Sequence, residues 1–311
     1  MSNPITISLI APIYGVERYI AQFADSVLSQ SYPYIEYIFV NDGTKDRSIE
    51  ILEGIIEQRY SHRKEQITIV HKENGGLPAA RKTGLEHATG DYIYHVDSDD
   101  WLAEGAIETI VKTIEATNSD VVYFNYVKEY EGRSKIKPQR CYSGATKWEY
   151  IRDMYNHKTP ASVWNKCIKR TLYADYTIYT PKYSYAEDCY LNAQLVGYAS
   201  TITHIDKTLY HYRKGNPNAI TRQAYRRRKR EYALNFMDLY EKYRDVPADK
   251  NPVAVIFDDM LIQAGWYSIL YRLRLFRDYP YLAQQIVKAK VREGNVWLVG
   301  QWITKLYARL R

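Results

Sequence analysis

Apolar and polar positions alternate regularly over the first 125 residues. Short runs of apolar and β-branched residues predict buried strands at residues 5–10, 35–40, 67–71, 92–96 and 121–124. Between these runs, apolar residues recur three and four positions apart, which predicts helices with one buried face. The expected faces comprise Val16, Ile20, Phe23 and Val27; Ile49, Leu52, Ile55 and Ile56; and Ile107, Ile110, Val111 and Ile114, with a glycine-interrupted helix from about Leu77.

This repetition of strand and helix predicts an α/β fold with a Rossmann-like, mostly parallel central sheet and helices on both faces. The pattern changes later in the chain, where residues 126–145 indicate a polar loop or hairpin and residues 208–213 a strand. Beyond that strand the sequence is mostly helical. We therefore expect a sheet domain at residues 1–221 and a helical C-terminal appendage at residues 222–311.

Ligands of such folds bind beyond the carboxyl ends of the strands, so the residues that follow each strand matter most. Residues 12–15, 41–44 and 97–100 follow the first, second and fourth expected strands. We expect these three strand ends to meet at one crevice.

The third strand end is acidic, with the sequence Asp97-Ser98-Asp99-Asp100. The carboxylates could cap a helix near residues 101–106. Alternatively they could hold a hard divalent cation, because oxygen ligands favour Mg²⁺ or Mn²⁺. Asp97 and Asp99 would point the same way if the strand geometry continued.

A second candidate segment lies upstream, at residues 74–84. Its glycines permit a close approach of the backbone to a ligand, and Arg81 could present a planar fork to a phosphate or nucleotide oxygen. The alternative is an ordinary loop and helix start.

Composition narrows the class of protein. The 311 residues are 46% apolar and 25% charged, as expected of a folded globular protein. The 32 tyrosines suit the rims of ligand clefts. Three cysteines without paired spacing support neither a disulfide framework nor a thiolate zinc site. With no apolar stretch near the roughly 18 residues of a membrane span, and no basic leader, we expect a cytoplasmic protein.

Positive charge is concentrated in the C-terminal appendage. Residues 222–311 contain 18 Lys and Arg against 9 Asp and Glu, a net charge of +9, whereas the whole chain carries +7. This charge could dock the protein on an anionic membrane surface, which would make it peripheral on the inner face of the membrane. A solvated helix face is the alternative. No nucleic-acid partner is expected, because no recognised binding module accompanies the arginines.

Five segments of the chain resemble the family 2 glycosyltransferases of the GT-A fold, over roughly residues 5–221. The segments, in the order of the family, are residues 11–20, 26–32, 38–46, 74–84 together with 97–100, and 187–188 after Trp164-Asn165-Lys166. The resemblance implies an inverting transfer of a sugar from a nucleoside diphosphate sugar, with UDP as the expected nucleotide, to an acceptor hydroxyl. It also implies Mn²⁺ or Mg²⁺ as cofactor.

The resemblance assigns roles by position. The implied donor-binding residues are Pro12, Tyr14, Asp42, Arg81, Asp97 and Ser98. Tyr14 would stack on the nucleobase and Asp42 would accept its imide N–H, while Asp99 would bind the metal. Asp188 would be the general base that takes the acceptor proton. Gly15 departs from the family, which usually has Asn there.

The resemblance and the local sequence together suggest four acceptor-side or secondary residues, which are Trp164, Glu187, His211 and Arg213. Glu187 and Asp188 begin a helix, and neighbouring helical residues point about 100° apart, so only one should face the sugar. Both could instead only complement the helix dipole. Trp164 could wall the acceptor cleft or belong to the core. His211 could be a metal ligand or a diphosphate donor, or could be structural.

The resemblance implies a function in assembling surface polysaccharide or a related glycan, with a carbohydrate or lipid-linked glycan as acceptor. A sugar nucleotidyltransferase should show a glycine-rich basic loop, which residues 11–18 lack. A dinucleotide dehydrogenase is disfavoured because no Gly-x-Gly-x-x-Gly follows the first strand. A non-catalytic carbohydrate- or membrane-binding module with the same fold stays open.

Overall fold

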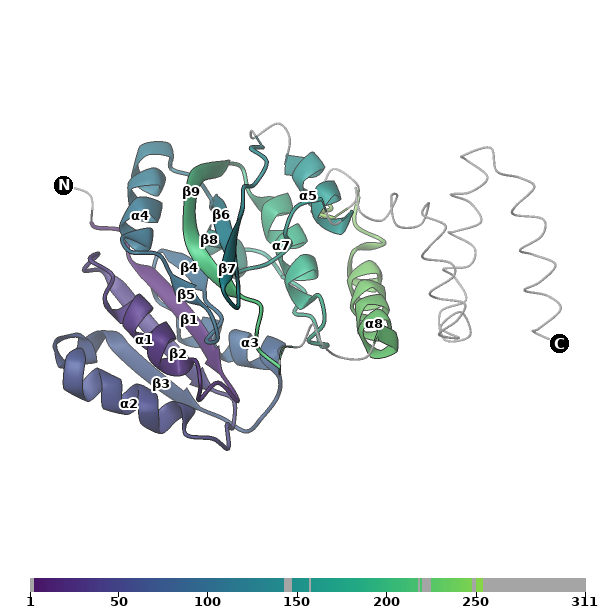
Figure 1. Ribbon diagram of the computed structural model, residues 1–311. Coiled ribbons are helices and arrows are strands. Elements are labelled where there is room, and N and C mark those ends of the chain that lie inside the picture. The colour runs from purple at the N-terminus through teal and green to yellow at the C-terminus, as the bar shows by residue number, and fades with distance from the viewer. Residues whose placement is uncertain are drawn as a thin grey trace.

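A mixed sheet forms the centre of the computed structural model, which describes residues 3–142, 147–156, 158–217, 219, 225–247 and 250–253 (Figure 1). Within these residues the sheet has nine strands, in the order β3-β2-β1-β4-β8-β6-β9-β5, and β7 pairs with β6. The strands are β1 (Ile7–Ile13), β2 (Ile35–Asn41), β3 (Ile67–His71), β4 (Tyr92–His95), β5 (Trp101–Leu102), β6 (Val121–Tyr130), β7 (Arg133–Lys137), β8 (Lys166–Lys169) and β9 (Ile202–Arg213).

The sheet has a parallel part and a mixed part. Strands β3, β2, β1 and β4 pair in parallel. Strand β8 is antiparallel to both β4 and β6, and β6 pairs with β9 in parallel, so six of the nine described strands run in one direction. This confirms the expectation of a mostly parallel sheet. Strands β5 and β7 are antiparallel additions at the margin.

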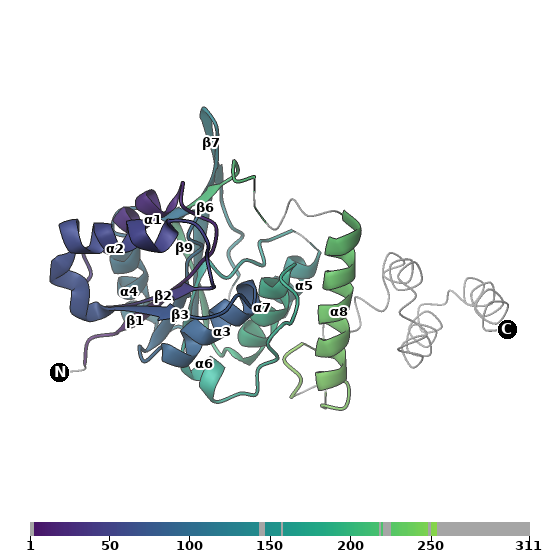
Figure 2. The ribbon, with the colours of Figure 1, turned by 90° about the horizontal axis from the view of Figure 1, so that it is seen from below.

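Helices cover both faces of the sheet, as the sequence predicts (Figure 2). The described helices are α1 (Ile20–Leu28), α2 (Ser48–Arg59), α3 (Leu77–His87), α4 (Ala106–Thr117), α5 (Lys147–Tyr155), α6 (Thr171–Ala174), α7 (Glu187–Tyr198) and α8 (Tyr225–Tyr243), with a 3-10 turn at Ser61–Gln66. Helices α1, α2 and α4 share one core cluster with Leu9 of β1. On the opposite face, Ile10 packs with Ala80 of α3. Strand β1 is therefore buried on both sides.

The structure differs from the sequence prediction at residues 101–106 and in two further elements, and it decides between the alternatives at residues 126–145. Residues 101–106 do not form the helix that we considered for the acidic cluster to cap, because β5 occupies Trp101–Leu102 and α4 begins at Ala106. Residues 126–145 contain the β6–β7 hairpin, one of the two expected possibilities. Strand β8 and helix α5 were not predicted.

Part of the expected C-terminal appendage packs on the sheet domain. Helix α8 places Ala233, Phe236 and Met237 in the same core cluster as Tyr190 and Leu195 of α7. Residues 254–311, with most of the expected membrane-docking surface, lie outside the described residues. Among the described helices, none combines the length and apolar character needed to cross a membrane.

Candidate functional site

Hydrogen bonds bring the ends of strands β1, β2 and β4 together. The Ser98 hydroxyl donates to the carbonyl of Pro12 at 2.6 Å, and the Asp42 N–H donates to the carbonyl of Ile13 at 3.1 Å. The structure therefore places the three predicted strand ends side by side. Pro12 and Ser98, both buried, hold this edge of the sheet in shape.

The loop after β1 presents an exposed ring. Tyr14 is 55% exposed, so its side chain is accessible to a ligand. Gly15 follows with a φ of +67°, a left-handed conformation, and its N–H donates to the Thr44 hydroxyl at 2.9 Å. Glycine and asparagine both tolerate this conformation, which explains why Gly15 can stand where the resembled family usually has Asn.

Asp42 is buried and already has several hydrogen-bond donors around it. Its carboxylate accepts from the Lys72 ammonium at 2.6 Å and from the backbone N–H groups of Gly75 and Gly76 at 2.9 and 2.8 Å. These contacts tie the end of β2 to the loop before α3. They leave little capacity for the nucleobase contact that the resemblance implies.

Arg81 joins the two acidic segments of the site. Its guanidinium, only 5% exposed, donates to Asp97 at 2.7 Å and forms a second ion pair with Glu187. The planar guanidinium that we expected to face a phosphate is present, but it pairs with the carboxylates of Asp97 and Glu187. The contact spans strands and helices that are distant in sequence, so it brings the acidic turn next to the start of α7.

The acidic segment forms a turn in place of a continued strand. Strand β4 ends at His95, and the N–H of Asp100 donates to the carbonyl of Asp97 at 3.1 Å. Asp100 is buried and accepts from the Tyr210 hydroxyl and the Arg213 N–H, at 2.8 and 2.7 Å. Asp100 therefore anchors the turn to β9.

Asp97 and Asp99 have the chemistry of a cation site. Burial and the nearby Asp97 carboxylate raise the pKa of Asp99, whose oxygen also accepts from Asn216 at 2.7 Å. A divalent cation beside these two oxygens would relieve their mutual repulsion. Among the described residues, no group of three or more His, Cys, Asp or Glu side chains is arranged to hold a metal. Any cation at Asp97 and Asp99 would therefore need further ligands from outside the described side chains, such as a bound diphosphate and water.

The structure confirms that α7 begins at Glu187 and separates the two carboxylates there. Glu187 is buried, pairs with Arg81, and accepts from the Asp188 N–H at 2.7 Å. Asp188 is partly buried. Burial raises the pKa of Asp188, and the positive charges of Arg81 and Lys166 oppose the shift. A carboxyl whose pKa is raised in this way is a better proton acceptor when ionised.

Trp164 is buried in a stack of aromatic rings. Its ring lies 4.5 Å from that of Tyr210 and 5.2 Å from that of Tyr212, both nearly parallel, and the Tyr126 ring meets it edge-on. Trp164 is 7% exposed, so it supports the Tyr212 ring more than it lines a cleft itself.

His211 and Arg213 lie on β9 beside the acidic turn. The His211 Nδ1 is 2.7 Å from the Glu129 carboxylate, and its ring stacks on Trp101 at 5.0 Å. The Arg213 guanidinium donates to the carbonyl of Asp99 at 2.8 Å and lies over the rings of Tyr19 and Trp101. Arg213 is therefore held against the acidic turn at Asp99, whereas His211 is held by Glu129.

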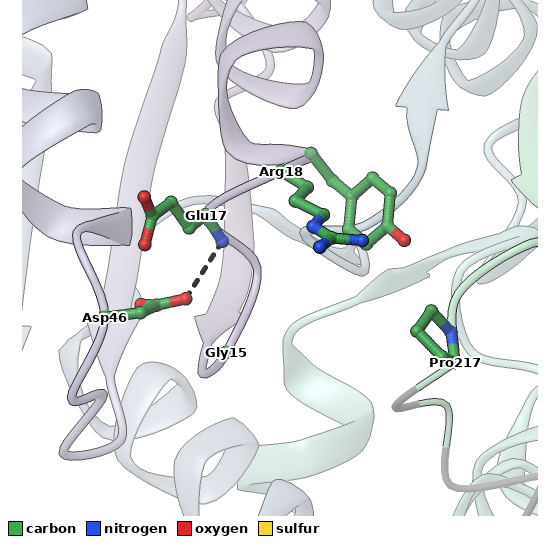
Figure 3. A pocket seen from close by; sticks show the side chains of 6 residues that line it. Gly15, Glu17, Arg18, Asp46 and Pro217 are labelled. Carbon is green, nitrogen blue, oxygen red and sulfur yellow. Dashed lines mark hydrogen bonds between the residues drawn. The ribbon is translucent and has the colours of Figure 1, made fainter.

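A pocket of about 510 Å³ opens next to this cluster. It is lined by Gly15, Glu17, Arg18, Tyr19, Asp46 and Pro217. Figure 3 shows the loop of Glu17 and Arg18 facing Pro217 across it, with the Glu17 N–H donating to Asp46 at 3.0 Å. Tyr19 connects the pocket to Arg213 and hence to the acidic turn.

Comparison with known proteins identifies the family. The family model described as glycosyl transferase family 2 matches residues 8–176. The chain belongs to this family. It is 33% identical to glycosyltransferase GlyA of Streptococcus pneumoniae over 217 aligned residues. The alignment covers 67% of this chain and 30% of GlyA. The chain is 32% identical over 226 residues to the uncharacterized glycosyltransferase EpsJ of Bacillus subtilis, which covers 71% of this chain and 64% of EpsJ. The chain thus spans less than two thirds of each.

Solved structures show the same fold. The structure of S. aureus TarS residues 1–349 in complex with UDP-GlcNAc matches with a TM-score of 0.65 at 21% identity, covering 92% of this chain and 81% of that one. The mannosyltransferase PcManGT from Pyrobaculum calidifontis, in complex with GDP-Man and Mn²⁺, matches with a TM-score of 0.54 at 18% identity, covering 100% and 82%. The expected GT-A fold is confirmed.

In the sequence, Lys166 stands out only as part of the Trp164-Asn165-Lys166 segment, and the resemblance assigns it no role. The Lys166 ammonium is 1% exposed and donates to the carbonyl of Ser162 at 2.7 Å and to the Asn165 side chain at 2.9 Å. Burial lowers the pKa of Lys166 to about 7, although the Asp188 charge opposes this shift. Its position after Trp164-Asn165 was visible in the sequence, but a lysine gives no sequence signal of burial.

Proposed function

We propose that this protein transfers a sugar from a UDP-sugar to an acceptor hydroxyl, with inversion at the anomeric carbon, in the assembly of a surface polysaccharide or related glycan. Family membership supports sugar transfer. The names of relatives support the setting, since one matched protein is the minor teichoic acid biosynthesis protein GgaB of Bacillus subtilis. The UDP-GlcNAc bound by TarS supports the choice of UDP.

The strand ends would bind the donor. The exposed Tyr14 ring suits stacking on the base, and Asp42, fixed by Lys72 and two backbone N–H groups, would shape the base pocket. Arg213, near Asp99, would face the diphosphate. A divalent cation held by Asp97 and Asp99 would supply Lewis-acid stabilisation of the departing diphosphate.

Asp188 would take the proton of the acceptor hydroxyl. The observation that supports this best is the Arg81 bridge between Asp97 and Glu187, because it sets the start of α7 beside the donor carboxylates. Glu187, fully engaged by Arg81, would be a positioning residue. The stack of Trp164 and Tyr212 would form the acceptor side of the same crevice.

Two conservative substitutions test these roles. We expect Asp188→Asn to lower turnover of the best nucleotide sugar by about 10²- to 10⁴-fold while UDP still binds, because only the proton acceptor is lost. We expect Asp99→Asn to lower turnover and also to abolish the Mn²⁺ dependence of UDP binding. A screen of nucleotide sugars by release of nucleoside diphosphate, starting with UDP-GlcNAc, measures the turnover of both variants. Calorimetric titration with UDP, with and without Mn²⁺, measures UDP binding.

The exposed Asp175 provides the matched control, since Asp175→Asn makes the same chemical change away from the site. Two outcomes would contradict the assignment. One is full activity of Asp188→Asn; the other is loss of UDP binding in Asp188→Asn together with normal activity of Asp99→Asn.

The location of this reaction is also a proposal. We place it at the inner face of the membrane, where a lipid-linked or polymeric acceptor is accessible, and the net charge of +9 over residues 222–311 supports this.

A further inference from the structure

The β6–β7 hairpin projects from the body of the molecule (Figure 2) and has two different faces. In its register Tyr126 lies opposite Lys137, Lys128 opposite Lys135, and Tyr130 opposite Arg133. Because side chains alternate along a strand, these six residues share one face. The opposite face includes Val127, Glu129, Ser134 and Ile136. We call the first the basic face.

The basic face is continuous with the proposed acceptor side of the site. Lys128 lies opposite Tyr212 of β9 in the register of the sheet. The Tyr212 ring stacks on Trp164, and the ammonium of Lys214 lies over the Tyr212 ring, 4.5 Å from its centre. Burial and then the charges of Asp100, Asp97, Asp99 and Asp188 raise the pKa of Tyr212, so the ring lies within electrostatic range of these carboxylates.

The lysines of this surface form no ion pair with a described carboxylate, although the Asp100 charge acts on Lys214. Within the described part of the chain, none of Lys128, Lys135, Lys137 and Lys214 forms an ion pair with a carboxylate. Burial lowers the pKa of Lys128, and the charges of the other three lysines lower it further. Like charges at this spacing repel each other, so an anion bound among them would stabilise the surface.

We propose that the basic face and Lys214 bind phosphate groups of the acceptor, which makes the acceptor a phosphate-bearing glycan. This rests on the proposed function, because it takes the Tyr212 side of the crevice as the acceptor side. The phosphate could belong to the diphosphate of a lipid-linked glycan or to the phosphodiesters of a polymer, and the four lysines suit either.

The two faces of the hairpin favour an acceptor over a bilayer surface. Ile136, which is 63% exposed, is the kind of residue that enters a membrane, but it projects on the face opposite the lysines. A flat bilayer could not contact both faces at once. An elongated anion lying along the basic face toward Tyr212 would pass all four lysines.

A pair of substitutions at Lys128 and Lys135 tests the proposal in the full chain. The probes are GlcNAc joined through a diphosphate to a short alkyl chain, the same alkyl glycoside without phosphate, and a glycerol phosphate oligomer. We expect Lys128→Gln/Lys135→Gln to weaken binding of the phosphate-bearing probes roughly tenfold at low salt, with a smaller effect as salt rises. Binding of the neutral probe should not change.

The matched control removes the same charge elsewhere. Lys64 and Lys112 are exposed lysines paired with Glu57 and Glu108, so Lys64→Gln/Lys112→Gln should change phosphate-probe binding less than about twofold. A larger loss for the alkyl diphosphate than for the oligomer would assign the phosphate to a lipid-linked glycan, and the reverse to a polymer. Either result supports the proposal.

Three outcomes would overturn it: equal affinity of the wild-type protein for charged and neutral probes, equal behaviour of the two double variants, or a loss confined to binding of phosphatidylglycerol vesicles. UDP binding is measured on the same samples without acceptor. A failure of the proposed UDP-sugar donor site would appear there, independently of the phosphate probes.

Discussion

The two halves of the sheet build their parts of the site by different means. The proposed donor half, strands β1–β4 with α1–α3, fixes its polar side chains through the backbone: Asp42 accepts from Gly75 and Gly76, and Ser98 donates to Pro12. The acceptor half, strands β6–β9 with α5–α8, relies on stacked rings around Trp164 and on a buried ammonium at Lys166.

The contrast suggests how the tasks are divided. Backbone N–H and carbonyl groups exist at every residue, so a site built on them keeps its shape while side chains around it change. Rings and lysines are side-chain features, which vary freely between proteins of one fold. The shape of the proposed donor side therefore depends more on backbone groups, and that of the proposed acceptor side more on the identity of its side chains.

The largest expected effect comes from breaking the link between the halves. In Arg81→Leu, Glu187 stays buried without its cationic partner, so we expect the free energy of unfolding to fall by about 3–5 kcal/mol. Urea denaturation at pH 7 measures it. Removing both partners in Arg81→Leu/Glu187→Leu should recover part of the loss, because no unpaired charge is then buried.

A surface ion pair provides the control for this change. Arg59 pairs with Asp25 at 2.6 Å but is about half exposed, and Arg59→Leu should cost less than about 1 kcal/mol. Equal losses for Arg81→Leu and Arg59→Leu would show that the halves are held together by other contacts.

A smaller effect, confined to the acceptor half, should appear as a pH dependence of stability. Burial lowers the pKa of Lys166 to about 7 from its ordinary 10.5. Between these values the unfolded chain binds more protons than the folded one, so the contribution of Lys166 to stability rises from pH 7 to pH 9 and is lost as the pH falls. The gain should be roughly 1–3 kcal/mol.

The measurement compares urea denaturation of the wild type and Lys166→Met at pH 7, 8 and 9. The variant should lack the gain. The corresponding buried group of the donor half is His95. Burial lowers the pKa of His95 to about 3, so the contribution of His95 to stability is lost only as the pH falls below about 6.5. A His95→Gln variant should therefore keep the gain between pH 7 and pH 9. The same slope in the wild type and Lys166→Met would contradict a buried, partly neutral lysine.

The same contrast explains how far the sequence predicts the fold. Residues 67–71 were predicted to the residue as a strand, because in the donor half each strand and helix has its own periodicity. Strand β8 was missed, since Lys166-Cys-Ile-Lys has no such pattern and is a strand only through its pairing with β4 and β6. Strand β5 has two residues and depends on β9 alone.

Prediction of the site was limited in the same way. Strand ends indicated where Tyr14, Asp42 and Asp97 would lie, because parallel strands end at a common edge. The partners of Arg81 could not be predicted, since Asp97 and Glu187 meet it only after two distant segments fold together. The burial of Lys166 likewise depends on tertiary packing.

The smallest expected effect is a change in UDP affinity that should follow a substitution in the donor half but not the matching substitution in the acceptor half. Ser98 and Ser162 are both buried, and each hydroxyl donates one hydrogen bond, Ser98 to Pro12 at 2.6 Å and Ser162 to Asn165 at 3.1 Å. Ser98→Ala and Ser162→Ala should therefore each lower the free energy of unfolding by about 1 kcal/mol. Only Ser98→Ala loosens the sheet edge where UDP is proposed to bind. Only this variant should therefore bind UDP more weakly, by about fivefold. Calorimetric titration with UDP and Mn²⁺ measures this difference, and an equal change in both variants would mean that the nucleotide site extends into the acceptor half.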